Sequence, residues 1–225
     1  LYNETLGTPI FPKPVIGMVG LLDDIRHATT QWFKAAGDEV LLLGETRDEL
    51  GGSEYLKVVH GQETGRPPRL DLDRERAVQA VCLAAIRAGL VRSAHDCADG
   101  GLAVALAECA MTGPDAALGG RFEIPGDLRP DSLLFGESAS RILLSVRPAD
   151  AEQVEAIARL HGVACARLGE VGGETIEFRG KGFAFSLPVA TVQETWATAL
   201  SRLLGLAPIP FTYGLTVRPE PFDLG

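Results

Sequence analysis

One ten-residue segment combines the residue types that bind anions and metal ions. Residues 93–102 read SAHDCADGGL and precede a strongly apolar stretch. Glycines at a helix start let an anion approach free backbone N–H groups, and carboxylates are ligands that Mg²⁺ prefers alongside phosphate oxygens. The segment therefore predicts a nucleotide or phosphate contact at Asp99, Gly100 and Gly101, with Asp96 as a candidate metal ligand.

The same segment also has a structural interpretation. Asp99 is a suitable N-cap for the following helix, and paired glycines form tight turns. A helix dipole contributes only about 0.3–1 kcal/mol per charge at an exposed end, whereas millimolar to micromolar binding needs about 4–8 kcal/mol. An anion site here would therefore need a metal, an arginine or several amides. His95 fits a hydrogen-bonded residue at a strand end better than a general base.

A second polar cluster lies just before another apolar stretch. Residues 133–141 read LLFGESASR and lead into ILLSV. Glu137 could coordinate Mg²⁺ or accept from an N–H group, while Ser138 and Arg141 are candidates for a phosphate contact. The alternative is a simple turn with an exposed Glu137. The G-x-S-x-G pattern is missing, so Ser138 is a poor candidate for a nucleophile.

A third segment, Gly51-Gly52-Ser53-Glu54-Tyr55-Leu56, is better explained as a linker or as a helix start capped by Ser53 than as a ligand contact. The sequence contains neither a Walker-type G-x-x-x-x-G-K-[ST] motif nor a G-x-G-x-x-G motif. A protein of this sequence that uses ATP would therefore bind it with a different fold.

Strands and helices alternate along the chain without a strict repeating unit, which predicts an α/β (α+β) fold. Hydrophobic periodicity and turn residues place the elements. Residues 15–22 (VIGMVGLL) are predicted to form a buried strand, and strands 163–171 and 175–178 to pair around Gly172-Gly173. The remaining predicted strands are 39–43, 91–95, 120–124 and 141–146, and the predicted helices are 53–59, one between Asp71 or Asp73 and Gly89, 102–111, 149–160 and 192–204.

Composition excludes several classes of protein. The 225 residues are 46% hydrophobic and 23% charged, with a net charge of −9 and no Lys/Arg-rich run, which argues against a nucleic-acid binder. No apolar run approaches the ~18 residues of a membrane span, and no signal peptide is visible. The four cysteines fit no zinc pattern and suggest reduced thiols of a cytoplasmic protein. The first residues, Leu-Tyr-Asn, favour a fragment of a longer chain.

Five motifs, in chain order, together resemble the second half of the large subunit of phosphoribosylformylglycinamidine synthase, and the match runs over about residues 1–204. They are LYNET (1–5), PVIGMVG (14–20), LGGSEYL (50–56), SAHD (93–96) with DGGLAVALAE (99–108), and FGES (135–138) with Arg141. The resemblance implies an aminoimidazole ribonucleotide synthetase-like C-terminal domain preceded by part of an A domain. The implied division is residues 1–48 from the second A domain, a junction at 49–69, the second B domain at 70–205, and an extended or disordered tail at 206–225.

The resemblance also implies a reaction. ATP would phosphorylate the amide oxygen of formylglycinamide ribonucleotide, and ammonia from glutamine would displace the phosphate. ATP and Mg²⁺ are the implied cofactors, and the implied partners are the remainder of the synthase chain, a glutaminase subunit and a small accessory subunit, with no nucleic acid and no membrane. The family's Gly-Asn-x-Ser stretch and catalytic histidine are missing from the 225 residues. No catalytic residue is therefore expected in this chain, and we expect it to be inactive alone.

Two alternatives stay open. By pseudo-symmetry the polar clusters could line an auxiliary nucleotide site, or they could be relics in a non-catalytic, structural domain. The chain could also belong to another member of the superfamily, such as aminoimidazole ribonucleotide synthetase, thiamine-phosphate kinase, selenophosphate synthetase or a hydrogenase-maturation factor. In the favoured interpretation, residues 1–48 cannot close a core alone, and their strands are expected to pair with strands from elsewhere.

Overall fold

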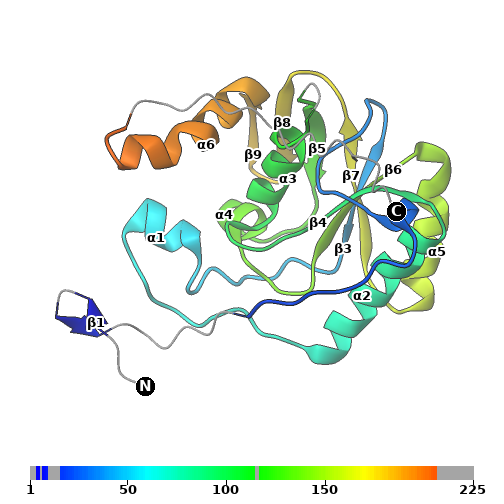
Figure 1. Ribbon diagram of the computed structural model, residues 1–225, viewed down its shortest axis with the longest axis horizontal. Coiled ribbons are helices and arrows are strands. Elements are labelled where there is room, and N and C mark those ends of the chain that lie inside the picture. Colours follow the sequence, from blue (N-terminus) through cyan, green and yellow to red (C-terminus); the bar gives the residue numbers. More distant parts are fainter. Residues whose placement is uncertain (1–3, 6, 10–15, 115–116, 207–225) are drawn as a thin grey trace, which may run out of the picture.

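The computed structural model describes residues 4–5, 7–9, 16–114 and 117–206. A seven-stranded sheet forms its centre, in the order β4-β6-β3-β7-β5-β8-β9 (Figure 1). Neighbouring strands are antiparallel except for β5 and β8, which are parallel. The strands are β3 (Glu39–Leu43), β4 (Val91–Asp96), β5 (Gly120–Ile124), β6 (Ile142–Val146), β7 (Cys165–Val171), β8 (Thr175–Gly180) and β9 (Phe183–Pro188).

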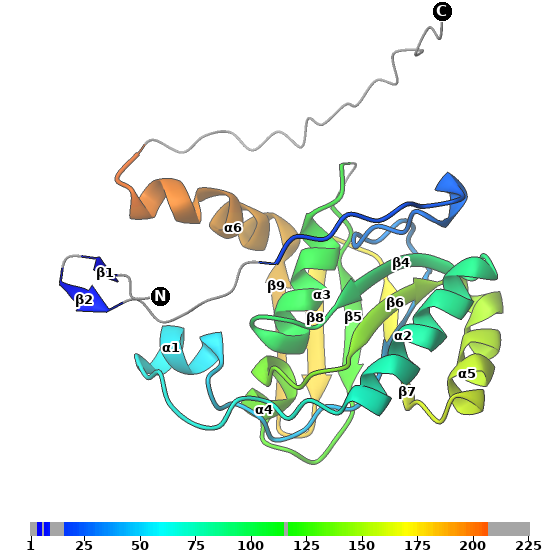
Figure 2. The ribbon, with the colours of Figure 1, turned by 60° about the horizontal axis from the view of Figure 1, so that its bottom comes forward.

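Helices cover both faces of this sheet. The helices α3 (Gly101–Met111), α4 (Pro130–Phe135) and α6 (Val189–Leu203) lie on one face, and α2 (Leu72–Arg87) and α5 (Ala151–Leu160) on the other (Figure 2). A mixed sheet between helices is the α/β architecture that the sequence predicts. The shorter elements are β1 (Glu4–Thr5), β2 (Thr8–Pro9), η1 (Ile25–His27), α1 (Glu54–His60) and η2 (Pro148–Asp150).

The central strand β3 shows why its sequence is almost uniformly apolar. Successive side chains of a strand point to opposite faces, so Val40 and Leu42 pack under α3 while Leu41 and Leu43 pack under α2 and α5. All four side chains are buried. A strand buried on both faces needs no polar alternation.

Local signals place α1, which lies inside the predicted junction 49–69, and α2, which follows it. Ser53 caps α1 by accepting from the amide of Leu56, and Asp71 caps α2 by accepting from the amides of Asp73 and Arg74. These caps confirm the predicted helix starts.

Three sequence expectations are wrong. Residues 16–22 form no strand and are exposed, with Val19 at 101% and Leu21 at 98%; Val15 lies outside the described residues. The strand 39–43, expected to pair outside the chain, pairs with β6 and β7 of the main sheet. The predicted hairpin of β7 and β8 is interrupted by β5, which pairs with both.

Each error has the same physical origin. Periodicity reports that a segment is apolar, but strand pairing depends on residues far away in the chain. The segment 16–22 has the pattern of a buried strand, yet it pairs with no strand among the described residues. The predicted tail 206–225 lies outside the described residues from position 207 onward. No helix in the described part of the chain is long and apolar enough to cross a bilayer.

Candidate functional site

The turn between β4 and α3 brings the glycines of the first polar segment to the start of a buried helix. Gly100 and Gly101 both adopt positive φ angles, 80° and 71°, a conformation that side chains with a Cβ rarely adopt. A Cβ on Gly101 would lie 2.5 Å from the carbonyl oxygen of Gly136. The glycine is therefore required where the second polar segment crosses the start of α3.

Glu137 joins these two segments directly. Its Oε1 atom accepts hydrogen bonds from the backbone N–H of Gly100 at 2.8 Å and from that of Glu54 at 2.9 Å. This contact brings the two polar segments together. The third segment, at the start of α1, converges on the same oxygen, which the sequence did not indicate.

The amide of Gly100, at the start of α3, is thus bound by a carboxylate from another part of the chain. Gly100 is the N-cap residue and no side chain of the cap itself bonds to the helix. The alternative in which Asp99 caps this helix is therefore wrong, because Asp99 is exposed and Glu137 takes the amide. A carboxylate near a helix N-terminus is favourable by the same electrostatics that would favour a phosphate.

Ser138 and Arg141, the expected phosphate contacts, are both buried. The Ser138 hydroxyl oxygen accepts from the backbone N–H of Arg47 at 3.0 Å. Arg141 donates from Nε to the Ser138 carbonyl, from Nη1 to Thr46 Oγ1 and from Nη2 to the Gly136 carbonyl, at 2.9, 3.0 and 2.6 Å. Burial lowers the pKa of Arg141 from its ordinary value. In this conformation both side chains hold the 136–141 loop together.

The two candidate metal ligands differ in their surroundings. Asp96 is 73% exposed at its side chain, and its Oδ1 lies 3.5 Å from His95 Nδ1. Glu137 has one carboxylate oxygen committed to two amides. Within the described ranges no group of three His, Cys, Asp or Glu side chains could hold a metal ion. The described residues therefore do not fit a metal centre of their own, and we derive no chemical step through a metal.

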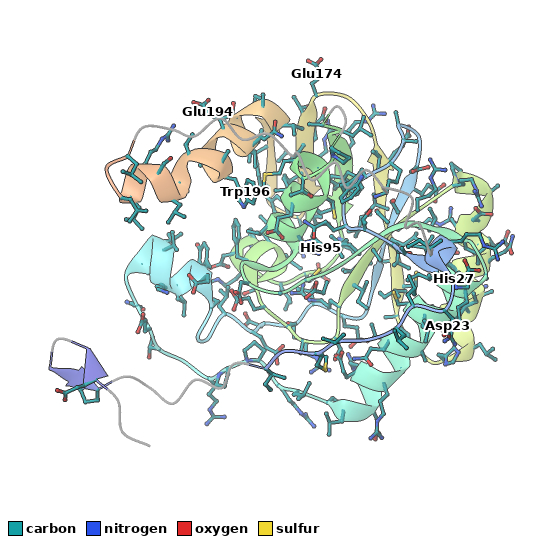
Figure 3. All side chains as sticks on the ribbon, in the orientation of Figure 1. Asp23, His27, His95, Glu174, Glu194 and Trp196 are labelled. Carbon is teal, nitrogen blue, oxygen red and sulfur yellow. The ribbon has the colours of Figure 1, made fainter. Side chains whose placement is uncertain are left out.

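His95 is hydrogen-bonded, as the structural interpretation of this residue expected. Its Nε2 lies 2.8 Å from Glu108 Oε2 on α3, and its side chain is 14% exposed. Figure 3 labels His95 near the centre of the molecule. His95 and Asp96 line a pocket of about 440 Å³ together with residues 29–32, Cys82, Ala94 and Ile142. Sequence reasoning missed Glu108 as the partner; its position as the one acid in an otherwise apolar helix is the signal that could have found it.

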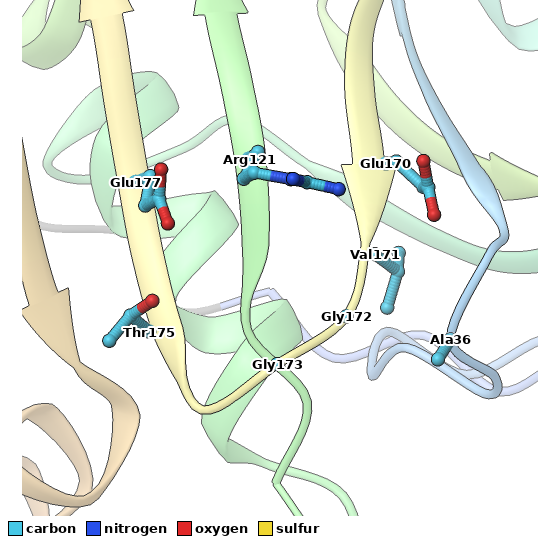
Figure 4. Close-up of a pocket in the computed structure, with 8 residues that line it drawn as sticks. All are labelled: Ala36, Arg121, Glu170, Val171, Gly172, Gly173, Thr175 and Glu177. Carbon is cyan, nitrogen blue, oxygen red and sulfur yellow. The ribbon is translucent and has the colours of Figure 1, made fainter.

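A second hollow, of about 360 Å³, lies over strands β5, β7 and β8 (Figure 4). Arg121 stands between Glu170 and Glu177 on neighbouring strands, and the Gly172-Gly173 turn closes one end. Alternating charges across adjacent strands are typical of a solvated sheet face. The sequence analysis did not single out these residues.

Comparisons with known proteins agree with this architecture. A family model described as "AIR synthase related protein, C-terminal domain" matches residues 35–181. The chain is 48% identical over 211 residues to phosphoribosylformylglycinamidine synthase subunit PurL of Anaeromyxobacter sp. strain Fw109-5, covering 91% of this chain and 27% of that protein. It is also 48% identical over 204 residues to the subunit PurL of Moorella thermoacetica, covering 90% and 27%. The chain therefore spans about a quarter of these relatives' length.

Solved structures show the same fold at lower identity. The phosphoribosylformylglycinamidine synthase II of Thermotoga maritima matches with a TM-score of 0.61 and 21% identity, covering 73% of this chain and 27% of that one. The T. maritima PurL complexed with FGAR matches with a TM-score of 0.66 and 20% identity, covering 75% and 30%. A T. maritima PurL complexed with ATP matches with a TM-score of 0.59 and 20% identity, covering 74% and 27%.

Proposed function

We propose that this chain is part of a phosphoribosylformylglycinamidine synthase of purine biosynthesis. The chain belongs to the AIR synthase related family, as the sequence resemblance predicted, because its residues 35–181 match the C-terminal domain of that family. The observation that carries this proposal is the 48% identity over 91% of the chain to a synthase subunit. The reaction would be the ATP-dependent conversion of formylglycinamide ribonucleotide to its amidine, with nitrogen from glutamine.

We propose that the chain contributes to this reaction only together with the rest of such a subunit. It spans 27% of the relatives' length, and the described residues at the candidate site bond mainly to one another. Glu137, Ser138 and Arg141 form a packed loop that supports the α3 start. Catalytic groups would come from outside these 225 residues.

ATP and Mg²⁺ are proposed as ligands of the complete enzyme. Mg²⁺ commonly binds through one or two carboxylates plus phosphate oxygens and waters, so the exposed Asp96 remains a candidate if a nucleotide supplies the other ligands. Asp99, Gly100 and Gly101 remain candidates for its phosphates, provided that Glu137 releases the Gly100 amide. The proposed partners are the remainder of the synthase chain, a glutaminase subunit and a small accessory subunit, in the cytoplasm.

The exposed apolar run indicates that a strand or sheet from the rest of the synthase subunit covers these residues. Ile16, Met18, Val19 and Leu21 are each at least 80% exposed. Each such side chain would gain about 1.5–3 kcal/mol on full burial. We propose that residues 16 to about 28 belong to the A domain and pair with its other strands. Residues 30–38 bond to Ala94, Cys109 and Val171 of the main body, so the B domain begins at about residue 30 rather than at residue 70.

A chimera tests the proposal. The matching segment of the Anaeromyxobacter subunit is replaced by this chain, and amidine formation is assayed with ATP, glutamine and the partner subunits. We expect activity within about tenfold of the parent, and none from the parent lacking the segment. A chimera that assembles with its partners and binds ATP, yet forms no amidine, would sink the proposal.

The alternative, a non-catalytic structural domain, is favoured by one observation. The polar groups that were expected to meet ligands already have partners within the chain. Asp96→Ala in the active chimera separates the two ideas, because a structural domain would keep full activity and unchanged ADP affinity in calorimetry. A loss of ADP affinity would support the auxiliary nucleotide site.

A further inference from the structure

Residues 52–64 form a closed loop on the surface of the molecule. The backbone N–H of Gly52 donates to the carbonyl of Thr64 at 2.8 Å. At the neck the two chain segments touch: a Cβ on Gly51 would lie 2.2 Å from the carbonyl oxygen of Arg66, and one on Gly65 would lie 2.6 Å from Gly51 Cα. A compact surface loop whose ends lie this close together is typical of an Ω-loop.

The helix inside the loop has little hold on the core. None of the residues in α1 is buried, and Val58 and Val59 are 77% and 58% exposed. An isolated helix of one or two turns is unstable in water. Its position on the molecule must therefore depend on a few contacts with the body.

Two contacts fix the loop to the body. The Tyr55 ring stacks on Phe135 at the end of α4, with centroids 5.0 Å apart and planes 9° apart. The backbone N–H of Glu54 donates to Glu137 Oε1 at 2.9 Å. Figure 1 shows α1 lying outside α4, at the periphery of the molecule.

The second contact is shared with the core. The same Glu137 oxygen accepts from the backbone N–H of Gly100, at the start of α3. One carboxylate oxygen therefore joins the first amide of α1 to the cap of α3. A charged acceptor makes stronger hydrogen bonds than a neutral one, which suits a single atom that must hold two elements.

We propose that Glu137 is a positioning residue that latches the 52–64 loop over the start of α3. When the latch is closed, the loop is held in place and the chain's own carboxylate occupies the Gly100 amide. Opening the loop through its glycine neck leaves Glu137 bound to α3 alone, while loss of Glu137 frees both amides. The latch stands on the geometry of this chain and does not depend on the proposed function.

Amide hydrogen exchange of the intact chain, read by NMR at single residues, tests the latch. We expect Glu137→Ala to accelerate exchange at Glu54 and at Gly100 by about tenfold or more, the effect of losing a hydrogen bond to a charged acceptor. Glu137→Gln should restore most of the protection, because the amide oxygen still accepts. The β3 amide of Leu42, in the centre of the sheet, reports global unfolding. The acceleration at Glu54 and Gly100 in Glu137→Ala should exceed any acceleration at Leu42.

The variant Tyr55→Leu distinguishes the contact of the loop from the contact of α3. Loss of the stack on Phe135 should speed exchange at Glu54 while Gly100 keeps its protection through Glu137. Glu63→Ala, an exposed acid of the same loop, is the matched control and should change neither amide. The latch is overturned if Glu137→Ala leaves either amide protected, or if Glu137→Gln behaves like Glu137→Ala.

Limited trypsin digestion gives a second reading that needs no assigned spectra. Lys57 lies in the middle of α1 with its side chain 54% exposed. Cleavage after Lys57 should be faster by about tenfold in Glu137→Ala and unchanged in Glu137→Gln and Glu63→Ala, because cleavage follows the population of the open loop. Equal cleavage in all four proteins would contradict the latch.

Discussion

The polar residues near the start of α3 mainly bond to other groups of the same chain. Arg141 is 2% exposed and its guanidinium binds two backbone carbonyls and a hydroxyl. Gly101 permits the 136–141 loop to touch the helix. These residues carry the motifs that resemble a ligand site, yet the contacts described for them are internal.

Arg141→Met should lower the free energy of unfolding by roughly 2–5 kcal/mol, because the carbonyls of Gly136 and Ser138 would be left buried without donors. Urea unfolding followed by circular dichroism measures this change. Arg159→Met, at an exposed position of α5, should cost less than about 0.5 kcal/mol. Equal effects would show that Arg141 does not hold the loop.

Gly101→Ala should destabilise the protein by more than about 2 kcal/mol, since it adds a clash with Gly136 to the strain of a positive φ. Gly182→Ala is the matched control. Gly182 has a φ of 84°, but nothing lies within 4 Å of the position that an added methyl group would take, so only the strain of about 1 kcal/mol applies. Thermal unfolding of both variants separates the clash from the strain.

The lowered pKa of Lys34 predicts that the free energy of unfolding depends on pH. The Lys34 Nζ donates to Thr30 Oγ1 and to the Trp32 carbonyl and lies 4.1 Å from the Trp32 ring centroid. Burial lowers the pKa of Lys34 from 10.5 to about 8. Between these two values the unfolded chain binds more protons than the folded one, so this residue makes stability rise with pH from about 8 to 10.5.

Lys34→Met removes this contribution. The stability of the wild type relative to the variant should therefore rise over that pH window and be flat below pH 7. Other titrating groups are common to both proteins and cancel in the difference. Urea unfolding of both proteins at pH 7, 8, 9 and 10 measures it, and a flat difference throughout would contradict the shifted pKa.

At the scale of elements, two segments of similar apolar composition differ in whether they are buried. The β3 strand is buried on both faces, whereas residues 16–22 are as apolar and fully exposed. Hydrophobic burial contributes about 25 cal/mol per Å² only where water is removed. Substitutions in the two segments should therefore differ sharply.

The double substitution Val19→Lys and Leu21→Lys should change the free energy of unfolding by less than about 0.5 kcal/mol, because both side chains are exposed in the isolated chain. Leu41→Ala, in β3, should cost about 2–5 kcal/mol. A large loss of stability from the double substitution would mean that the segment is already packed.

At the scale of the whole molecule, the sequence predicts which helices and strands form better than it predicts which strands pair. The caps at Ser53 and Asp71 and the continuous apolar run of β3 are local signals, and each predicted its element. The insertion of β5 between β7 and β8 is not local, because the Gly172-Gly173 turn fits a hairpin equally well. The strand β9 and the helix α4 were missed. All residues of β9 after Phe183 are exposed, so it shows no apolar face, and α4 has only six residues.

The candidate site follows the same rule. The glycine turn and the acidic loop could be recognised from residue types, and their contact could be expected from the resemblance. The shared oxygen of Glu137 could not, because its two partner amides lie 37 and 83 residues away in the chain. The residue types of a segment indicate which ligands it could bind. Whether its polar groups are already hydrogen-bonded within the chain depends on the fold.

Residues 16–25 are the proposed face by which this chain would join the rest of a synthase subunit. Hydrogen exchange by mass spectrometry on peptides covering 16–25, compared between the isolated chain and the chimera, tests it most directly. We predict exchange close to the unprotected rate in the isolated chain, slowed by about a hundredfold or more in the chimera, as for a strand in a stable sheet. Exchange in the folded chimera as fast as in the isolated chain would contradict the account.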